Sequence, residues 1–190
     1  MIQKYSLAIE PSELILSRVK EMKQQLRIAV GGHYGSANSA AHISLFEFKI
    51  ADDRYSLIST HYKRIVAGLA PFDIAFDGFD HFQHGMYFTF YVKLTERTSG
   101  TILNYCKQIK NISPYSHVNK FIVPHMTIGR RLTKRGLDLA YGLFTEFVFN
   151  YCCEAFVVRK FNSKRGQYDI EELVPLLNSG LTSNAQLSLF

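Results

Sequence analysis

The chain has no tryptophan and only three cysteines, and no apolar run approaches the roughly 18 residues needed to cross a membrane. Residues 1–5 lack the apolar core of a secretory signal peptide. Cys106, Cys152 and Cys153 form an odd set with two neighbours, which argues against both a disulfide framework and a Cys-x-x-Cys metal site. We therefore expect a cytoplasmic protein that does not enter membranes and whose cysteines are small buried side chains.

Aromatic and basic side chains are plentiful. The 190 residues include 15 Phe and 11 Tyr, which favour strands, and the length is enough for one domain whose core needs neither metal nor disulfide. The formal net charge is +6 and the pI is about 9.2. This charge favours an anionic partner such as a nucleotide or RNA, although it would also serve solubility alone.

Apolar periodicity predicts alternating strands and helices. Strands are expected at residues 5–10, 41–48, 72–76, 79–82, 87–94, 121–128 and 154–161, with a final edge strand at 168–176. Helices are expected after a Ser12 cap, where Ile15, Val19, Met22 and Leu26 share one face, and at residues 56–69, 99–109 and 134–149. The order of elements in the first half recurs in the second.

A shift of 83 residues aligns the two halves, for example Leu7 with Phe90 and Ile74 with Val157. Strand then falls on strand and helix on helix, which indicates a duplicated strand-helix-strand-helix-strand unit.

The repeat sets the expected domain organisation. We expect a single bilobal domain over residues 1–177, with repeats at approximately 3–82 and 86–165. Residues 178–190 are small and polar with few anchors, so a loosely ordered C-terminal tail is predicted there.

The same shift superimposes two short motifs. His42 and His125 are each followed two places later by a hydroxyl residue, Ser44 and Thr127. Residues i and i+2 of a strand point to the same face, so two such strands would place two imidazoles and two hydroxyls around one cleft. Such a set suits proton transfer at phosphorus. A lone strand histidine is more often a core or surface residue, but the matched pair favours function.

The paired motifs and the duplicated layout resemble the 2H (two-histidine) phosphoesterase superfamily, in particular the bacterial 2'-5' RNA ligases and related cyclic phosphodiesterases. The resemblance spans roughly residues 3–176, and residues 124–130 match most closely because they keep an arginine, Arg130, five places after the histidine. The first motif departs from the pattern: Ser44 stands where threonine is commoner, and Glu47 is the counterpart of Arg130.

The resemblance implies an α+β, duplicated and bilobal fold, with antiparallel-rich sheets around a central cleft and helices outside. It also implies chemistry that needs no metal and no cofactor. His42 and His125 would be the catalytic acid and base, in an order that the symmetrical pattern leaves open. Ser44, Thr127 and Arg130 would bind the substrate phosphate. Arg130 equally fits a solvated basic turn.

The loop at residues 31–36 is rich in glycine but has no Walker lysine, which favours a flexible rim to the cleft over a phosphate loop. Within it, His33 and Tyr34 are candidates for base stacking or for the cleft rim, or else for packing. His81 and His84 lack a carboxylate or cysteine partner at ligand spacing, so no metal site is predicted.

Two functions remain open at this point. The first is a phosphodiesterase that hydrolyses 2',3'-cyclic phosphate ends of RNA or small cyclic nucleotides, with reversible 2'-5' RNA ligase activity as an added capacity. The second is a non-catalytic RNA- or nucleotide-binding module that uses the same cleft. Binding alone does not require two proton-transfer groups, so we favour the enzyme, acting as a monomer.

Overall fold

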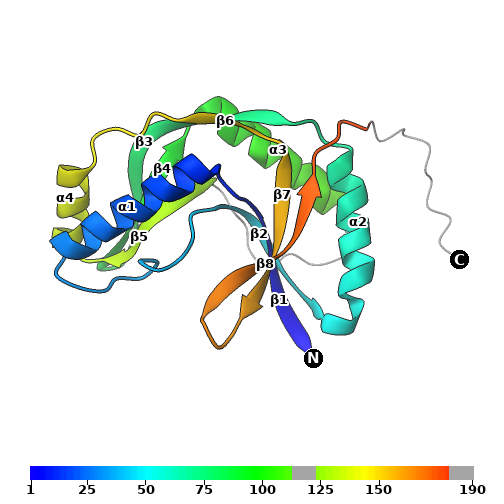
Figure 1. The fold of residues 1–190 in the computed structure, drawn as a ribbon, viewed down its shortest axis with the longest axis horizontal. Helices are drawn as coiled ribbons and strands as arrows, with labels where there is room; N and C mark the ends of the chain where they lie inside the picture. The colour runs from blue at the N-terminus through cyan, green and yellow to red at the C-terminus, as the bar shows by residue number, and fades with distance from the viewer. Residues whose placement is uncertain (113–122, 180–190) are drawn as a thin grey trace, which may run out of the picture.

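The chain is described by a computed structural model that covers residues 1–112 and 123–179 (Figure 1). Over these residues it contains four α-helices, one short 3-10 helix and eight strands, which confirms the predicted α+β class. The strands are β1 (Ile2–Ile9), β2 (Ile43–Ala51), β3 (Phe72–His84), β4 (Tyr87–Leu94), β5 (His125–Leu132), β6 (Asn150–Cys153), β7 (Ala155–Asn162) and β8 (Gln167–Pro175). The helices are α1 (Glu13–Ala29), η1 (Asp52–Arg54), α2 (Tyr55–Ala67), α3 (Glu96–Ile112) and α4 (Lys134–Leu143).

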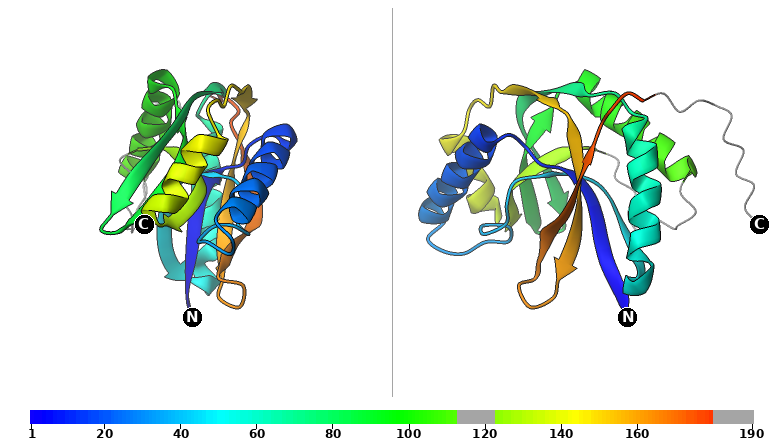
Figure 2. Two further views of the ribbon diagram at one scale, coloured as in Figure 1. Left: turned by 90° about the vertical axis from the view of Figure 1, so that its left-hand side faces the viewer. Right: turned by 45° about the vertical axis from the view of Figure 1, so that its right-hand side comes forward.

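The strands form one continuous curled sheet in the order β6-β3-β4-β5-β2-β1-β7-β8, rather than the separate sheets that we expected (Figure 2). The pairings within the described residues are antiparallel. The two central strands, β2 and β5, are in register at Ile43 and Met126. These residues directly follow the histidines of the two motifs, so the register brings the motifs side by side at the middle of the sheet.

The strand order is symmetrical about this centre. Moving outward from β5 and β2, the sheet continues with β4 and β1, then with β3 and β7. A shift of 83 residues places α1 on α3 residue for residue, and it places β1 and β2 over β4 and β5 with small offsets. The duplicated unit stays a prediction, because similar element positions do not establish common descent.

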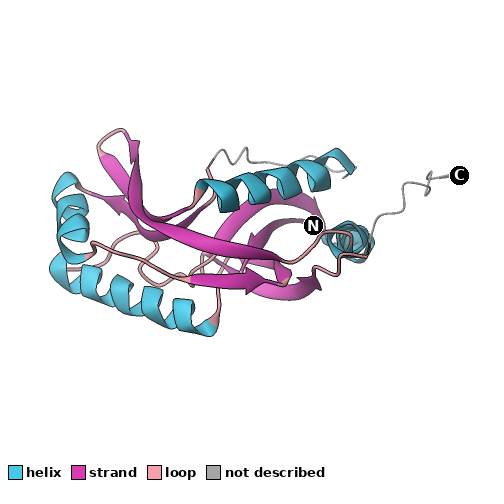
Figure 3. Cartoon of the chain, turned by 90° about the horizontal axis from the view of Figure 1, so that it is seen from above, coloured by secondary structure: helices cyan, strands magenta, loops and turns pink. Residues whose placement is uncertain are grey.

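The helices lie outside the sheet in two pairs, α1 with α4 and α2 with α3 (Figure 3). Helix α1 buries Ile15, Val19, Met22 and Leu26, as its spacing predicts. Ser12 is the N-cap residue, as predicted, and its carbonyl accepts from the backbone N–H of Leu16, but its side chain makes no capping hydrogen bond.

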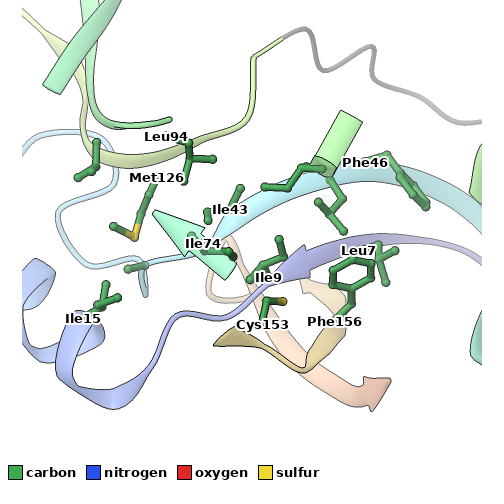
Figure 4. Close-up of a cluster of buried hydrophobic side chains, with 14 of the residues drawn as sticks. Leu7, Ile9, Ile15, Ile43, Phe46, Ile74, Leu94, Met126, Cys153 and Phe156 are labelled. Carbon is green, nitrogen blue, oxygen red and sulfur yellow. The ribbon is translucent and has the colours of Figure 1, made fainter. Parts of the chain in front are cut away.

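The apolar core lies between the sheet and these helices. It draws side chains from both halves of the chain, including Leu7, Ile43, Met126 and Phe156 (Figure 4). Ile43 and Met126 are fully buried there. Because successive strand residues point to opposite faces, their neighbours in each motif are directed to the other face of the sheet.

The second half differs from the prediction after α4. The helix expected over residues 134–149 ends at Leu143, and Phe144 already has an extended backbone. Phe144 and Phe147 have helical spacing, but both pack their rings against Phe79. The short strand β6 follows, which the sequence did not indicate.

The C-terminal region is also partly corrected. The predicted edge strand is β8, at the end of the sheet. Asn178 and Ser179, assigned to the loose tail, donate backbone hydrogen bonds to the carbonyls of Leu69 and Ala67. The rest of the predicted tail, residues 180–190, lies outside the described residues, as do residues 121 and 122 of the strand expected at 121–128.

Two other expectations can be compared with the structure. Cys106 and Cys153 are buried as predicted, whereas Cys152 is exposed. Among the helices that the structure describes, none is long and apolar enough to cross a membrane.

Candidate active site

Both motifs open into one cleft of about 900 Å3 on the side of the sheet away from the core. Ser44 lines it from β2 and His42 from the position just before that strand, while His125 and Thr127 line it from β5. All four side chains are half-buried. The structure therefore brings together the two histidines and two hydroxyls, as the paired motifs predict. Their catalytic role stays a proposal.

Each histidine is held by a matching hydrogen bond. The Nδ1 atom of His42 lies 2.9 Å from the carbonyl oxygen of Ala40, and that of His125 lies 2.9 Å from the carbonyl oxygen of Val123. A carbonyl only accepts hydrogen bonds, so Nδ1 must carry the proton in both rings. The neutral rings then leave Nε2 unprotonated and able to accept a proton.

Burial changes the acidity of both rings. It lowers the pKa of His42 to about 3, and the nearby positive charge of Arg159 adds to the effect. Burial also lowers the pKa of His125. The hydrogen bond to Val123 opposes this effect, but it is the smaller of the two. A charge on His125 further lowers the pKa of His42, so the two rings interact electrostatically. The lowered pKa values favour the neutral form of both imidazoles at neutral pH.

Two more hydroxyl residues line the cleft beside the motifs. Ser6 lies on β1 and Thr89 lies on β4, and both are buried. They are themselves 83 residues apart. The sequence argument missed them, although the same shift that aligned the histidines would have found them.

Arg159, on β7, is a cleft residue that the sequence argument also missed. Its side chain is only 6% exposed, donates from Nη2 to the carbonyl of Tyr168 and lies with its guanidinium 5.5 Å from the centre of the Tyr168 ring. Within the described part of the chain, its buried Nη1 has no hydrogen-bond partner. The available signal was an arginine directly after the apolar run of residues 156–158, because an arginine is rarely buried without a partner.

Arg130 and its counterpart Glu47 both line the cleft, but they differ in exposure and in their contacts. Arg130 is exposed. Glu47 forms an ion pair with Lys4 at 2.9 Å and accepts a hydrogen bond from the Tyr168 hydroxyl at 2.8 Å. Glu47 is negatively charged, so it cannot play the part of Arg130 on the His42 side of the cleft. A positive charge near His42 comes from Arg159.

The two residues proposed for the cleft rim, His33 and Tyr34, lie in different environments. His33 is exposed and lines the cleft. Tyr34 is 6% exposed within the apolar core, and its hydroxyl donates to the backbone carbonyl of Lys23 at 3.1 Å. The prediction for Tyr34 is therefore wrong, since a ring fixed in the core cannot stack on a ligand in the cleft.

His81 and His84 do not act together. His84 lines the cleft, whereas Nδ1 of His81 lies 3.0 Å from the hydroxyl of Tyr141. In the part of the chain that the structure describes, no three His, Cys, Asp or Glu side chains are grouped as metal ligands.

Comparison with known proteins gives a consistent result. A sequence model of the 2'-5' RNA ligase superfamily matches residues 11–159, which include both histidine motifs. No curated protein sequence matches the chain significantly.

Several solved structures share the fold. E. coli LigT complexed with 3'-AMP has a TM-score of 0.65 at 14% identity, over 93% of this chain and 99% of that one. TT0787 of Thermus thermophilus has a TM-score of 0.67 at 14% identity, over 92% and 98%. Usb1 of Kluyveromyces marxianus has a TM-score of 0.54 at 14% identity, over 92% and 98%. Identities this low show a common fold only.

Proposed function

Because the chain belongs to the 2'-5' RNA ligase superfamily, we propose that it is a phosphodiesterase that hydrolyses 2',3'-cyclic phosphate ends of RNA or small cyclic nucleotides without a metal ion. The observation that carries the proposal is the matched pair of histidines on one cleft, each with Nδ1 bonded to a backbone carbonyl and Nε2 left for proton transfer.

The reaction requires two proton transfers. Water attacks the phosphorus atom, and Nε2 of one histidine takes the proton of the water. The bond from phosphorus to one ribose oxygen breaks, and the second histidine, protonated at Nε2, donates its proton to that oxygen. The product carries a phosphate monoester on one ribose oxygen and a free hydroxyl on the other.

One histidine must therefore be protonated, although burial favours the neutral form of both. A bound phosphate supplies a negative charge, which favours the charged form of an adjacent imidazole and raises its pKa. Substrate binding is thus expected to take up a proton from solution, and the cleft becomes competent only when the phosphate is present.

The remaining cleft residues are suited to stabilise the phosphate. The hydroxyls of Ser44 and Thr127 are hydrogen-bond donors for its non-bridging oxygens, where charge concentrates during the reaction. Arg130 and Arg159 add charge-assisted hydrogen bonds. Similarity to E. coli LigT, which was crystallised with 3'-AMP, NADP+ and ATP, supports a nucleotide as the ligand.

The same groups would catalyse ligation, in which the 5'-hydroxyl of a second RNA end replaces water as the nucleophile. The bond from phosphorus to the 3' oxygen breaks, that oxygen takes a proton from a histidine, and a 2'-5' link remains. Joining requires a second RNA end that is positioned in the cleft, whereas water is always available. We therefore propose hydrolysis as the main activity.

A direct test is turnover of the four 2',3'-cyclic nucleotides and of short RNAs with a cyclic phosphate end, with and without EDTA. We expect turnover in EDTA, a loss of at least about 100-fold in His42→Ala and in His125→Ala, and near-native activity in Lys20→Ala, an exposed position outside the cleft. No turnover across this panel would contradict the enzyme and leave the nucleotide-binding module. Activity lost in EDTA would contradict a metal-free reaction.

A further inference from the structure

The two walls of the cleft carry different side chains at matching positions. Ser6 and Thr89 are related by the shift of 83 residues, and both face the cleft. On the adjacent outer strand, Ser6 pairs with Arg159, whereas Thr89 pairs with Phe82. The wall beside His42 thus has a guanidinium where the wall beside His125 has a phenyl ring.

The Arg159 side offers a partly unsatisfied positive charge. Its buried Nη1 has no hydrogen-bond partner among the described residues, and Arg159 lines the same cleft as His42. A buried N–H group of a cation is costly to leave unpaired. A phosphate oxygen in the cleft would both pair with the guanidinium charge and accept a hydrogen bond from Nη1. Binding of the phosphate against Arg159 is therefore favoured.

The Phe82 side offers an aromatic surface. Phe82 stacks on Tyr91 with ring centres 4.4 Å apart, and it meets His125 edge to face at 5.0 Å. The ring is half-buried and lines the cleft. The ring of His84, which also lines the cleft, lies 6.3 Å from it. Phe82 is thus held by its neighbours, and its cleft-lining surface offers a rigidly placed ring on which a nucleobase can stack.

Aromatic rings also line the opposite wall, but cations cover them. Nζ of Lys4 lies 5.7 Å from the ring centre of Phe161 and 5.5 Å from that of Tyr168, and Arg159 also lies over Tyr168. Within the described residues, no such cation lies over Phe82. A base that stacked beside His42 would have to displace these cations, which costs their interaction with the rings.

We propose that the cleft binds a nucleotide in one orientation, with the base on Phe82 beside His125 and the phosphate toward Arg159 beside His42. This inference deepens the proposed function, on which it rests, by assigning a base subsite and a phosphate subsite. Phe82 and Arg159 are then specificity-determining residues, and substrates without a base lose the contact with Phe82.

Calorimetric titration tests the orientation without requiring turnover. The probes are adenosine 3'-monophosphate and inorganic phosphate. Phe82→Ala is expected to weaken binding of the nucleotide by about tenfold, as loss of one stacked base does, while phosphate binding stays native. The matched control Phe161→Ala is expected to change neither by more than about twofold, since cations already occupy that ring.

The phosphate subsite has its own variants. Arg159→Met is expected to weaken both probes by a similar factor, and Arg159→Lys, which keeps the charge, to weaken both less. Thermal unfolding of each variant identifies one that has failed to fold. If Arg159→Met fails to fold, Arg159→Lys is the variant that tests the phosphate subsite. Native binding of both probes by Arg159→Lys would then contradict that subsite.

The outcomes separate the two proposals. Nucleotide binding that depends on Phe161 and not on Phe82 overturns the orientation, as does equal dependence on both or no binding of the nucleotide. Binding through Phe82 by a protein that turns over no cyclic phosphate overturns the proposed function and supports the orientation. Turnover of 2',3'-cyclic AMP with a native KM in Phe82→Ala supports the function and overturns the orientation.

Discussion

The backbone N–H of Arg130 donates to the carbonyl oxygen of Gly35 across 2.9 Å. This bond joins the loop that precedes the first histidine to the strand that carries the second. The approach is so close that a Cβ atom on Gly35 would lie 2.9 Å from the carbonyl oxygen of Arg130. The loop at residues 31–36, expected as a flexible rim, is thus bonded to β5.

Replacing this glycine should disturb the cleft. In Gly35→Ala the added methyl group must push against the backbone of Arg130, so we expect the free energy of unfolding to fall by about 1–3 kcal/mol and the KM for a cyclic nucleotide to rise. Urea unfolding and steady-state kinetics measure both. Gly32→Ala is the matched control, because its Cβ would meet no atom within 4 Å. Equal behaviour of the two variants would argue against the close contact.

Lys23 is expected to position His42 from outside the cleft. Its buried ammonium donates to the carbonyls of Ser36 and Ser39, at 3.2 and 2.8 Å, and so holds the loop that leads to His42. In Lys23→Met we expect kcat to fall by about tenfold with KM little changed, because small displacements of a reacting group are costly. The exposed Lys20→Met, on the same helix, should behave as the native protein.

The free energy of unfolding separates this role from a general structural one. Removing the ammonium takes one donor from each carbonyl, but that of Ser36 still accepts from the backbone N–H and the hydroxyl of Ser39. A buried charge is removed as well, so we expect a net change below about 2 kcal/mol. A native kcat in Lys23→Met would exclude the positioning role.

The proposed orientation assigns the acid and the base. With the nucleoside beside His125, the ribose oxygen leaves toward His125, and water attacks from the side of His42. A nitrophenolate leaving group needs no protonation. On bis(4-nitrophenyl) phosphate we therefore expect His125→Ala to stay within about tenfold of the native rate and His42→Ala to lose at least about 100-fold. The reverse pattern would exchange the two roles.

Acid should destabilise the fold through the cleft histidines. Burial lowers the pKa of His42 from 6.5 to about 3, so between these values the unfolded chain binds a proton that the folded chain does not. The free energy of unfolding therefore falls as the pH drops from about 6.5 toward 3. Urea unfolding at several pH values should show a shallower dependence in His42→Gln than in the native protein. A native slope in His42→Gln would contradict the shift.

Local patterns in the sequence predicted most of the fold and the centre of the site. The face of α1 follows from the spacing of Ile15, Val19, Met22 and Leu26, and the shared cleft follows from the alternation of side chains along two strands. Both depend on residues that are close in the sequence, where periodicity carries the information.

Features that depend on distant pairing were not predictable. Arg159 reaches the cleft because β7 pairs with β1, and Phe82 reaches it because a register shift in the β3–β4 pair sets which side chains face inward. Tyr34 was misassigned because its burial depends on how the loop folds back on α1, where its hydroxyl meets Lys23. Composition and local spacing do not encode which distant strands pair or how a loop packs on a helix.

The place of β1 in the sheet has a consequence for synthesis of the protein. β1 is synthesised before β7, yet β7 is one of its two neighbours in the sheet. Until β7 is made, the buried strand around Leu7 presents an open edge of unpaired backbone groups, which is prone to pair with other chains. Nascent or truncated chains that lack β7 should therefore aggregate, and the sheet can be completed only after β7 has been synthesised.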